Sequence, residues 1–231
     1  MEERARAPMT ETRWTVGVEG EEAPVLIQTP EAPRGTLVFA HGAGGHMEHR
    51  HMASLAEVFL ELGLEVVRFN FLYRASGRSI PDRMPKLQAC FNSVVASVRE
   101  RLAPKRILLG GHSMGGRCAS MMAAEGFACD GLLLCAYPLH PPGQFNKLRD
   151  AHLPAIQVPT LCLNGTQDPL CDKELMDAVL PRLDQRFQMH WLEHADHSFH
   201  VLKRSGRTDA EVLAEVAGTV EEWLPEGPPD G

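Results

Sequence analysis

The sequence lacks several features that would assign it to a specialised class of protein. No apolar run approaches the roughly 20 residues that a transmembrane helix needs. The first ten residues contain two arginines but no apolar segment of the kind found in signal peptides. Basic residues are outnumbered by acidic ones, 23 to 30, and the net charge of −7 disfavours binding to nucleic acid or to anionic membranes. We therefore expect a soluble, cytoplasmic protein that binds neither nucleic acid nor membranes.

Cysteine pairs with a recognisable spacing are also missing. The six cysteines form no C-x-x-C pair and no regular pattern. Several lie within apolar segments such as LLLCAY and TLCLNG, where a free cysteine behaves as a small hydrophobic residue. Because disulfide frameworks are typical of secreted chains, we interpret the cysteines as buried free thiols.

The composition is that of one globular domain. The 231 residues are 44% hydrophobic and 23% charged, values close to the average for folded proteins. We expect a single domain at residues 11–225, with flexible ends at 1–10 and 226–231.

Short aliphatic and β-branched runs alternate with segments of helical periodicity. An antiparallel pair of strands is expected at 12–18 and 23–29. Several of the later runs are apolar throughout, as parallel strands covered on both faces are. The alternation predicts an α/β fold with a mostly parallel sheet, helices on both of its faces, and ligands bound beyond the C-terminal ends of the strands. The later strands are expected at 35–40, 64–71, 106–110, 131–137, 160–164 and 187–192, and helices around 52–60, 87–102, 173–183 and 212–224.

The strongest chemical signal is GHSMG at 111–115. It lies between the strand segment RILLG and the helical stretch GRCASMMAAEG. In that context G-x-S-x-G predicts a nucleophile elbow, a sharp and strained turn that exposes the Oγ of Ser113 at the end of a strand. Gly111 and Gly115 lack Cβ atoms, so the helix can pack closely beneath the turn. A glycine-rich turn without chemistry is the alternative, and the flanking strand and helix count against it.

A nucleophilic serine needs a base and an acid that orients the base, in the chain order Ser, Asp or Glu, His. For the acid we favour Asp168, which follows a predicted strand and is kept out of a helix by Pro169. Two other aspartates fit this role less well. Asp130 precedes its strand, and Asp196 directly adjoins His197, the histidine favoured below as the base. An ordinary Asx turn is the alternative interpretation of Asp168.

For the base we favour His197, in the segment WLEHADHSFH between the last strand and the last helix. His194 and His200 lie in the same segment and remain competitors. Three histidines within seven residues therefore compete for the role of the base.

The loop HGAGG at 41–45 directly follows the strand TLVFA. We expect the backbone amides of Ala43 and Met114 to form an oxyanion hole, because glycines let the main chain approach a reacting carbonyl group. A dinucleotide-binding loop is disfavoured because the third glycine of that motif is missing, and no G-K-[ST] of a Walker A loop occurs.

Two further groups of side chains are weaker candidates. The histidines of H-x-x-H-x-H at 46–51 have no obvious further ligand, so a solvated helix start is favoured over a metal site. Arg74, Arg78 and Arg83 lie on the loop after residue 71, where they are candidates for binding an anionic group of a substrate. A solvated loop is the alternative, and we expect no metal and no cofactor.

Four segments, HGAGG, GHSMGG, NGTQDP and HADHSF, resemble the α/β-hydrolase superfamily across residues 33–225. More narrowly, FNFLYRASGRSIPD, GGHSMGGRCASMMA and YPLHPPGQFNKLRDAHLPAI are similar to small predicted hydrolases related to dienelactone hydrolase. That family includes the hydrolase-like domain of a nonspecific-lethal complex subunit. The resemblance implies an α/β-hydrolase fold with Ser113 as nucleophile, Asp168 as acid and His197 as base. Dienelactone hydrolases proper carry Cys in place of Ser113, and the narrower family often has Lys in place of His112.

The superfamily's lid is usually inserted after the strand expected at 131–137. Here only about twenty residues, 139–158, separate that strand from the next, too few for a helical cap domain. We therefore expect an open cleft and a serine hydrolase of small carboxylic or thio esters. A catalytically idle interaction module and a small peptidase are the alternative functions.

Overall fold

The computed structural model describes residues 9–224. Residues 1–8 and 225–231, which include most of the two segments expected to be flexible, lie outside the described residues. Met9 and Thr10 belong to the first strand, so the strand begins earlier than the predicted domain boundary at residue 11.

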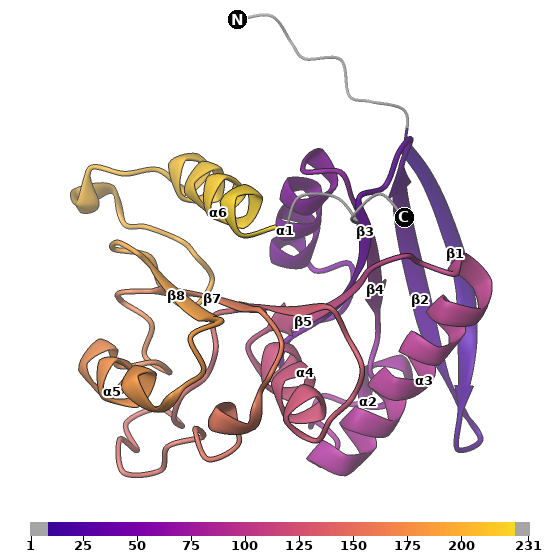
Figure 1. The fold of residues 1–231 in the computed structure, drawn as a ribbon, viewed down its shortest axis with the longest axis horizontal. Helices are drawn as coiled ribbons and strands as arrows, with labels where there is room; N and C mark the ends of the chain where they lie inside the picture. Colours follow the sequence, from indigo (N-terminus) through magenta and orange to yellow (C-terminus); the bar gives the residue numbers. More distant parts are fainter. Residues whose placement is uncertain (1–8, 225–231) are drawn as a thin grey trace, which may run out of the picture.

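One eight-stranded sheet runs through the whole domain (Figure 1). Its strand order is β1-β2-β4-β3-β5-β6-β7-β8. The hairpin of β1 and β2 pairs antiparallel with β4, and all the later strands are parallel to one another. The strands are β1 Met9–Val18, β2 Glu21–Pro30, β3 Gly35–Ala40, β4 Leu64–Phe69, β5 Ile107–His112, β6 Gly131–Cys135, β7 Thr160–Gly165 and β8 Phe187–Leu192. The predicted α/β fold with helices on both faces is confirmed.

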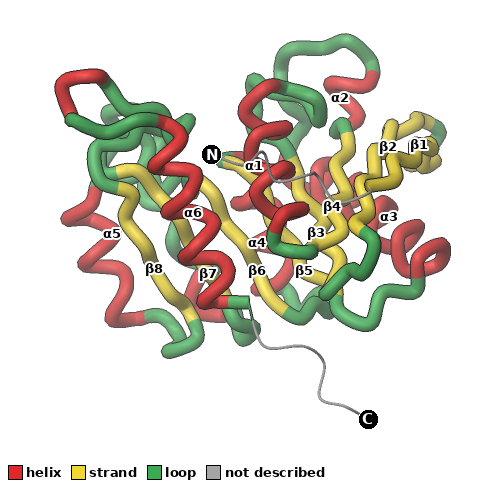
Figure 2. Tube along the Cα trace, turned by 90° about the horizontal axis from the view of Figure 1, so that it is seen from above, coloured by secondary structure: helices red, strands yellow, loops and turns green. Residues whose placement is uncertain are grey.

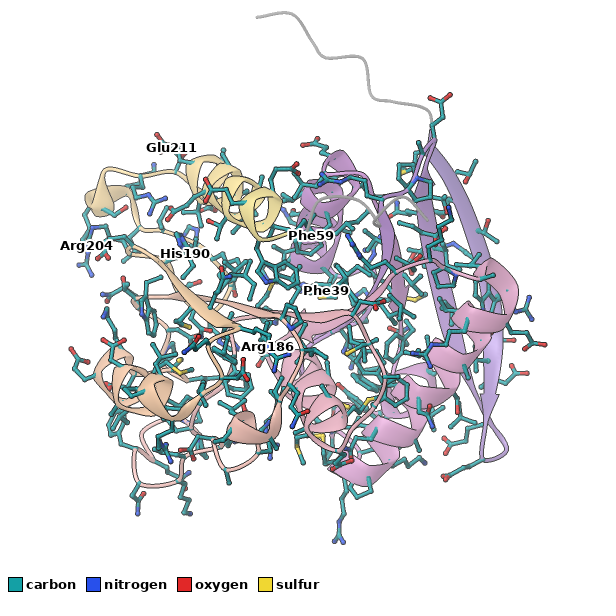
Figure 3. All side chains as sticks on the ribbon, in the orientation of Figure 1. Phe39, Phe59, Arg186, His190, Arg204 and Glu211 are labelled. Atoms are coloured by element: carbon teal, nitrogen blue, oxygen red, sulfur yellow. The ribbon has the colours of Figure 1, made fainter. Side chains whose placement is uncertain are left out.

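Helices cover both faces of the sheet, as the view from above in Figure 2 also shows. On one face, α1 and α6 pack over the centre and the β8 side, and Figure 3 shows Phe39 of the sheet beside Phe59 of α1, with ring centroids 5.2 Å apart. On the other face, α3, α4 and α5 close a second apolar cluster. The helices are α1 Arg50–Glu61, α2 Leu72–Ala75, α3 Met84–Leu102, α4 Met114–Ala124, α5 Lys173–Val179 and α6 Asp209–Trp223, with single 3₁₀ turns at Leu153–Ala155, Leu180–Arg182 and Lys203–Ser205.

Two strands end earlier than the sequence predicts, each because a side chain captures a backbone amide. Strand β4 ends at Phe69 rather than at residue 71, since the Phe71 amide donates to Nε2 of His41 at 3.2 Å. Strand β6 ends at Cys135 rather than at residue 137, since the Tyr137 amide donates to Oδ1 of Asn164 at 2.9 Å. Both amides leave the ladder for loops at the C-terminal edge of the sheet.

Other boundaries shift for local reasons. The helix expected at 173–183 ends as an α-helix at Val179, and the Leu180–Arg182 turn, which contains Pro181, continues it. Strand β5 starts one residue later than expected and extends to His112. Five of the six cysteines are buried free thiols as expected, whereas Cys129 is only partly buried.

The connection between β6 and β7 carries no lid. Residues 136–159, all of which the structure describes, contain one 3₁₀ turn at Leu153–Ala155 and no α-helix. The C-terminal edge of the sheet is therefore not covered by a helical cap. None of the helices between residues 9 and 224 combines the length and apolar character needed to cross a bilayer.

Candidate active site

The turn at Ser113 has the strained backbone that the motif predicts. Ser113 has φ 52° and ψ −116°, in the region that L-residues rarely occupy, and its amide donates to the Cys135 carbonyl at 2.8 Å. A Cβ atom at Gly115 would lie 2.3 Å from the Ala40 carbonyl oxygen, and one at Gly111 would lie 2.6 Å from the same atom. Only glycine at both positions lets α4 start this close to β3, and the predicted reason for the two glycines is confirmed.

His197 lies between the serine and an aspartate. Its Nε2 is 2.9 Å from the Oγ of Ser113, and its Nδ1 is 2.8 Å from Oδ2 of Asp168. The three side chains come from the loops that follow β5, β7 and β8, which end at the same edge of the sheet. The arrangement gives the serine hydroxyl a ring nitrogen to which it can donate a proton.

Both carboxylate oxygens of Asp168 accept hydrogen bonds that the sequence did not indicate. Its side chain is fully buried, its Oδ1 accepts from the Leu170 amide at 2.8 Å, and its Oδ2 also accepts from Nδ2 of Asn164 at 3.2 Å. The same Nδ2 donates to the Tyr137 carbonyl at 3.1 Å. Asn164 therefore fixes the carboxylate relative to the end of β6.

The sequence interpretation missed Asn164. The signal was present, since an asparagine at the end of an apolar strand is a buried polar side chain that needs partners. Gly165 directly follows Asn164 at the end of β7. A Cβ atom there would lie 2.0 Å from the Ala195 carbonyl oxygen, so this glycine lets the loop of Asp168 meet the loop of His197.

The other histidines and aspartates considered for the roles of base and acid interact with groups outside the pair formed by His197 and Asp168. His200 binds both carboxylate oxygens of Asp209 at 2.9 Å, and His194 faces Glu193 with a separation of 3.8 Å. Asp196 caps its own turn by accepting from the amides of residues 198 and 200. Asp130 accepts from the Ile107 amide at 2.7 Å, at the opposite edge of the sheet.

The loop after β3 passes directly against the elbow. A Cβ atom on Gly42 would lie 3.4 Å from the Cβ of Ser113. His41 is fully buried, with Nδ1 2.7 Å from the Gly42 carbonyl, and burial lowers its pKa to about 4. Tyr73 donates its hydroxyl to the Ala43 carbonyl at 2.7 Å. These bonds fix the loop that carries the Ala43 amide near Ser113.

A second histidine contact was not foreseen. His112, directly before the serine, has Nε2 2.8 Å from the His197 carbonyl oxygen. Because a carbonyl only accepts, His112 donates this bond. Burial lowers the pKa of His112 well below its ordinary value, which keeps the ring neutral. The ring of His51 packs against it, with centroids 4.5 Å apart.

The arginines of the loop after β4 and the histidines of residues 46–51 have different surroundings in the structure. Nη1 of Arg78 pairs with Asp82 at 2.9 Å on the surface, so the charge of Arg78 is already partnered. Nη1 of Arg74 makes a long bond, 3.4 Å, to the Arg78 carbonyl. His51 of the three-histidine segment turns inward against His112, and no group of three potential metal ligands occurs between residues 9 and 224.

Comparisons with known proteins place the chain among hydrolase folds. Residues 33–225 match the family model described as an alpha/beta hydrolase domain. The chain is similar to an α/β serine hydrolase without a lid from Xanthomonas campestris, with 24% identity, a TM-score of 0.75, and 96% of this chain and 98% of the other covered. It is also similar to an α/β serine hydrolase homologue from Coxiella burnetii, with 21% identity, a TM-score of 0.75, and 92% of this chain and 97% of the other covered. A dienelactone hydrolase from Anabaena variabilis is similar as well, with 20% identity, a TM-score of 0.75, and 94% of this chain and 97% of the other covered.

Proposed function

The chain belongs to the alpha/beta hydrolase domain family, and we propose that it is a serine hydrolase that cleaves small carboxylic or thio esters through an acyl-enzyme. The single observation that carries this proposal is the pair of contacts made by His197, to the serine hydroxyl and to the buried carboxylate. The serine hydrolases and the dienelactone hydrolase among the similar structures are consistent with it.

The proposed reaction begins with proton transfer from Ser113. With Asp168 ionised, Nδ1 of His197 carries the ring proton, so Nε2 accepts the proton of the serine hydroxyl as Oγ attacks the ester carbonyl carbon. The buried carboxylate stabilises the imidazolium that forms. We propose that the Ala43 and Met114 amides donate to the developing oxyanion, since neither makes a hydrogen bond to a group in residues 9–224.

The second half of the reaction regenerates the enzyme. When the tetrahedral intermediate collapses, the bond to the leaving oxygen or sulfur breaks, and His197 returns its proton to that atom. A water molecule then attacks the acyl-serine carbonyl carbon and gives a proton to Nε2. The acid departs, and the serine hydroxyl regains its proton from the same nitrogen. An open edge without a lid favours short acyl groups in this scheme.

The test is the Ser113→Ala variant with short p-nitrophenyl esters. We expect kcat/KM to fall at least about 1,000-fold, because the nucleophile is lost. The hydroxyl contributes about 1 kcal/mol to folding, against a typical domain stability of roughly 5–15 kcal/mol, so the variant should stay folded. Ser93→Ala is the matched control, since the Oγ of Ser93 donates to the Ala89 carbonyl within α3. Its activity should equal that of the wild type.

Labelling with a fluorophosphonate probe gives an independent readout. Wild-type protein should gain one covalent probe molecule, and Ser113→Ala none. Unchanged esterase activity in Ser113→Ala would refute the mechanism. Absence of both labelling and turnover in the wild type would instead favour the idle interaction module.

A further inference from the structure

The ring of His112 lies where three loops of the candidate active site meet. His112 ends β5, directly before Ser113, and its ring centroid is 5.0 Å from that of His197. A Cβ atom on Gly42 would lie 3.0 Å from Nδ1 of His112, so the ring also reaches the loop after β3. One side chain therefore contacts the loops after β3 and β8 from the end of β5.

The hydrogen bond of His112 is made to the residue that carries the base. Nε2 of His112 is 2.8 Å from the carbonyl oxygen of His197. Because a carbonyl only accepts, the proton of the His112 ring is on Nε2. A bond to the backbone of residue 197 fixes the point from which its side chain extends toward Ser113 and Asp168.

The loop that carries the base has a strained backbone. His194 and Phe199, on the two sides of His197, have φ angles of 64° and 60°, in the left-handed region that residues other than glycine rarely adopt. A backbone bond closes the loop on itself, from the Phe199 amide to the Asp196 carbonyl at 3.0 Å. The bond from His112 ties this strained loop to the central strand β5.

A second ring packs against His112 from the first turn of α1. The ring centroid of His51 is 4.5 Å from that of His112, at an interplanar angle of 74°, and 5.8 Å from that of Phe199. Burial lowers the pKa of His51 to about 4 and that of His112 well below its ordinary value. Both rings are therefore neutral at pH 7.5, and they add no positive charge beside His197 when it becomes an imidazolium.

We propose that His112 is a positioning residue for the base: its hydrogen bond to the His197 carbonyl holds the imidazole of His197 in line with Ser113 and Asp168. The inference rests on the proposed function and adds to it a residue that acts through the backbone of the base. A misplacement of about 1 Å can reduce a reaction rate about 100-fold, so loss of this bond should lower kcat more than it changes KM.

Variants at residue 112 separate the donor from the ring. His112→Phe keeps a planar ring against His51 but leaves the His197 carbonyl without its donor. For p-nitrophenyl acetate, kcat should fall about 10- to 100-fold while KM changes by less than about twofold. His112→Gln keeps an N–H donor on a side chain of similar length, so its kcat should stay within about threefold of the wild type. His112→Met also lacks the donor, should behave as His112→Phe, and replaces it if that variant does not fold.

His190→Phe is the matched control. His190, labelled in Figure 3, lies on β8, which is separated from β5 by β6 and β7. Its Nε2 is 2.8 Å from Oε1 of Glu215 on α6. The control therefore removes an imidazole and a hydrogen bond of the same length as in His112→Phe, and its kcat and KM should equal those of the wild type. Thermal unfolding of every variant establishes that it is folded at the assay temperature.

The tautomer of His197 gives a readout that does not depend on turnover. Because Asp168 accepts from Nδ1, nitrogen NMR of protein with isotope-labelled histidine should show the His197 proton on Nδ1 at pH 7.5. The His197→Gln variant assigns the signals. In His112→Phe the loosened ring should populate the other tautomer, whereas His112→Gln and His190→Phe should keep the wild-type ratio. A loss of stability alone, in a variant that is still folded, would not alter this ratio.

The outcomes distinguish this inference from the proposed function. If esters are hydrolysed and the folded donor-free variants keep kcat within about twofold of the wild type, the positioning role is refuted and the hydrolase remains. Equal losses of kcat in His112→Phe and His112→Gln would also overturn it, because the donor would then not matter. If the wild type hydrolyses no ester, the proposed function fails and the tautomer ratio decides. A ratio that changes in His112→Phe would support the positioning role, and an unchanged ratio would overturn it.

Discussion

Acidification should destabilise this protein well above the pH at which carboxylates titrate. Burial lowers the pKa values of His41, His51 and His152 from 6.5 to about 4. In the unfolded chain these imidazoles return to a pKa near 6.5. As the pH falls from 6.5 to 4, the unfolded state takes up protons that the folded state does not, so the free energy of unfolding decreases.

The magnitude follows from the size of the shifts. For one histidine whose pKa is 6.5 in the unfolded chain and about 4 in the folded protein, the free energy of unfolding falls by about 2 kcal/mol between pH 7.5 and pH 5. His41 is fully buried and should show the whole effect, whereas His51 and His152 are partly exposed and should show less. We expect a total loss of at least about 3 kcal/mol, a large part of a typical stability of roughly 5–15 kcal/mol. The raised pKa of His200 acts in the opposite direction, but that exposed ion pair is screened by salt.

Urea unfolding followed by tryptophan fluorescence at pH 7.5 and pH 5, in about 0.15 M salt, measures this loss. In His41→Gln the loss between the two pH values should shrink by about 2 kcal/mol, although the variant is less stable at pH 7.5. Val95→Ala is the control, because it removes buried core volume and no titratable group. It should be less stable at both pH values with the wild-type pH dependence. A wild-type stability that is equal at pH 7.5 and pH 5 would refute the reasoning.

Three further predictions concern the site and its support. Asn164→Ala should lower kcat about 10-fold or more with little change in KM, because Asp168 loses the amide that orients it; an unchanged kcat in a folded variant would contradict this role. In a thermal unfolding assay, Gly115→Ala should destabilise the fold by more than about 3 kcal/mol, since its Cβ would lie 2.3 Å from the Ala40 carbonyl oxygen. Gly218→Ala is the control: a Cβ at this position on α6 would meet open space, so the variant should be more stable by about 0.5–1 kcal/mol. Each buried CH₂ adds at most about 0.8 kcal/mol, so an open cleft should give higher kcat/KM for p-nitrophenyl acetate to butyrate than for decanoate; a kcat/KM still rising at ten carbons would indicate a deep apolar tunnel instead.

The sequence by itself determined the class of fold and the places where chemistry was expected. Apolar runs set the parallel strands, because a strand covered on both faces can hold few polar residues. The glycines of 111–115 predicted the strained turn at Ser113, since no other residue allows a helix to start that close to a neighbouring strand. The order of the strands along the chain then favoured Asp168 and a later histidine, because both follow strands that were expected to end at the same edge as β5.

The tertiary structure alone decided which side chains meet. The choice among His194, His197 and His200 depends on the curvature of one loop and on the partner Asp209, which lies outside that loop. The ends of β4 and β6 were likewise set by His41 and Asn164, which are each separated from the captured amides by about thirty residues.

The same reason applies to charged side chains. Arg78 pairs with Asp82, only four residues away in the sequence, whereas Arg34 pairs with Glu221 and Arg182 with Asp150, which lie far away along the chain. Local patterns encode secondary structure because backbone geometry repeats over a few residues. Pairing of charged and polar side chains depends on groups that only the folded chain brings together, so only the tertiary structure could reveal it.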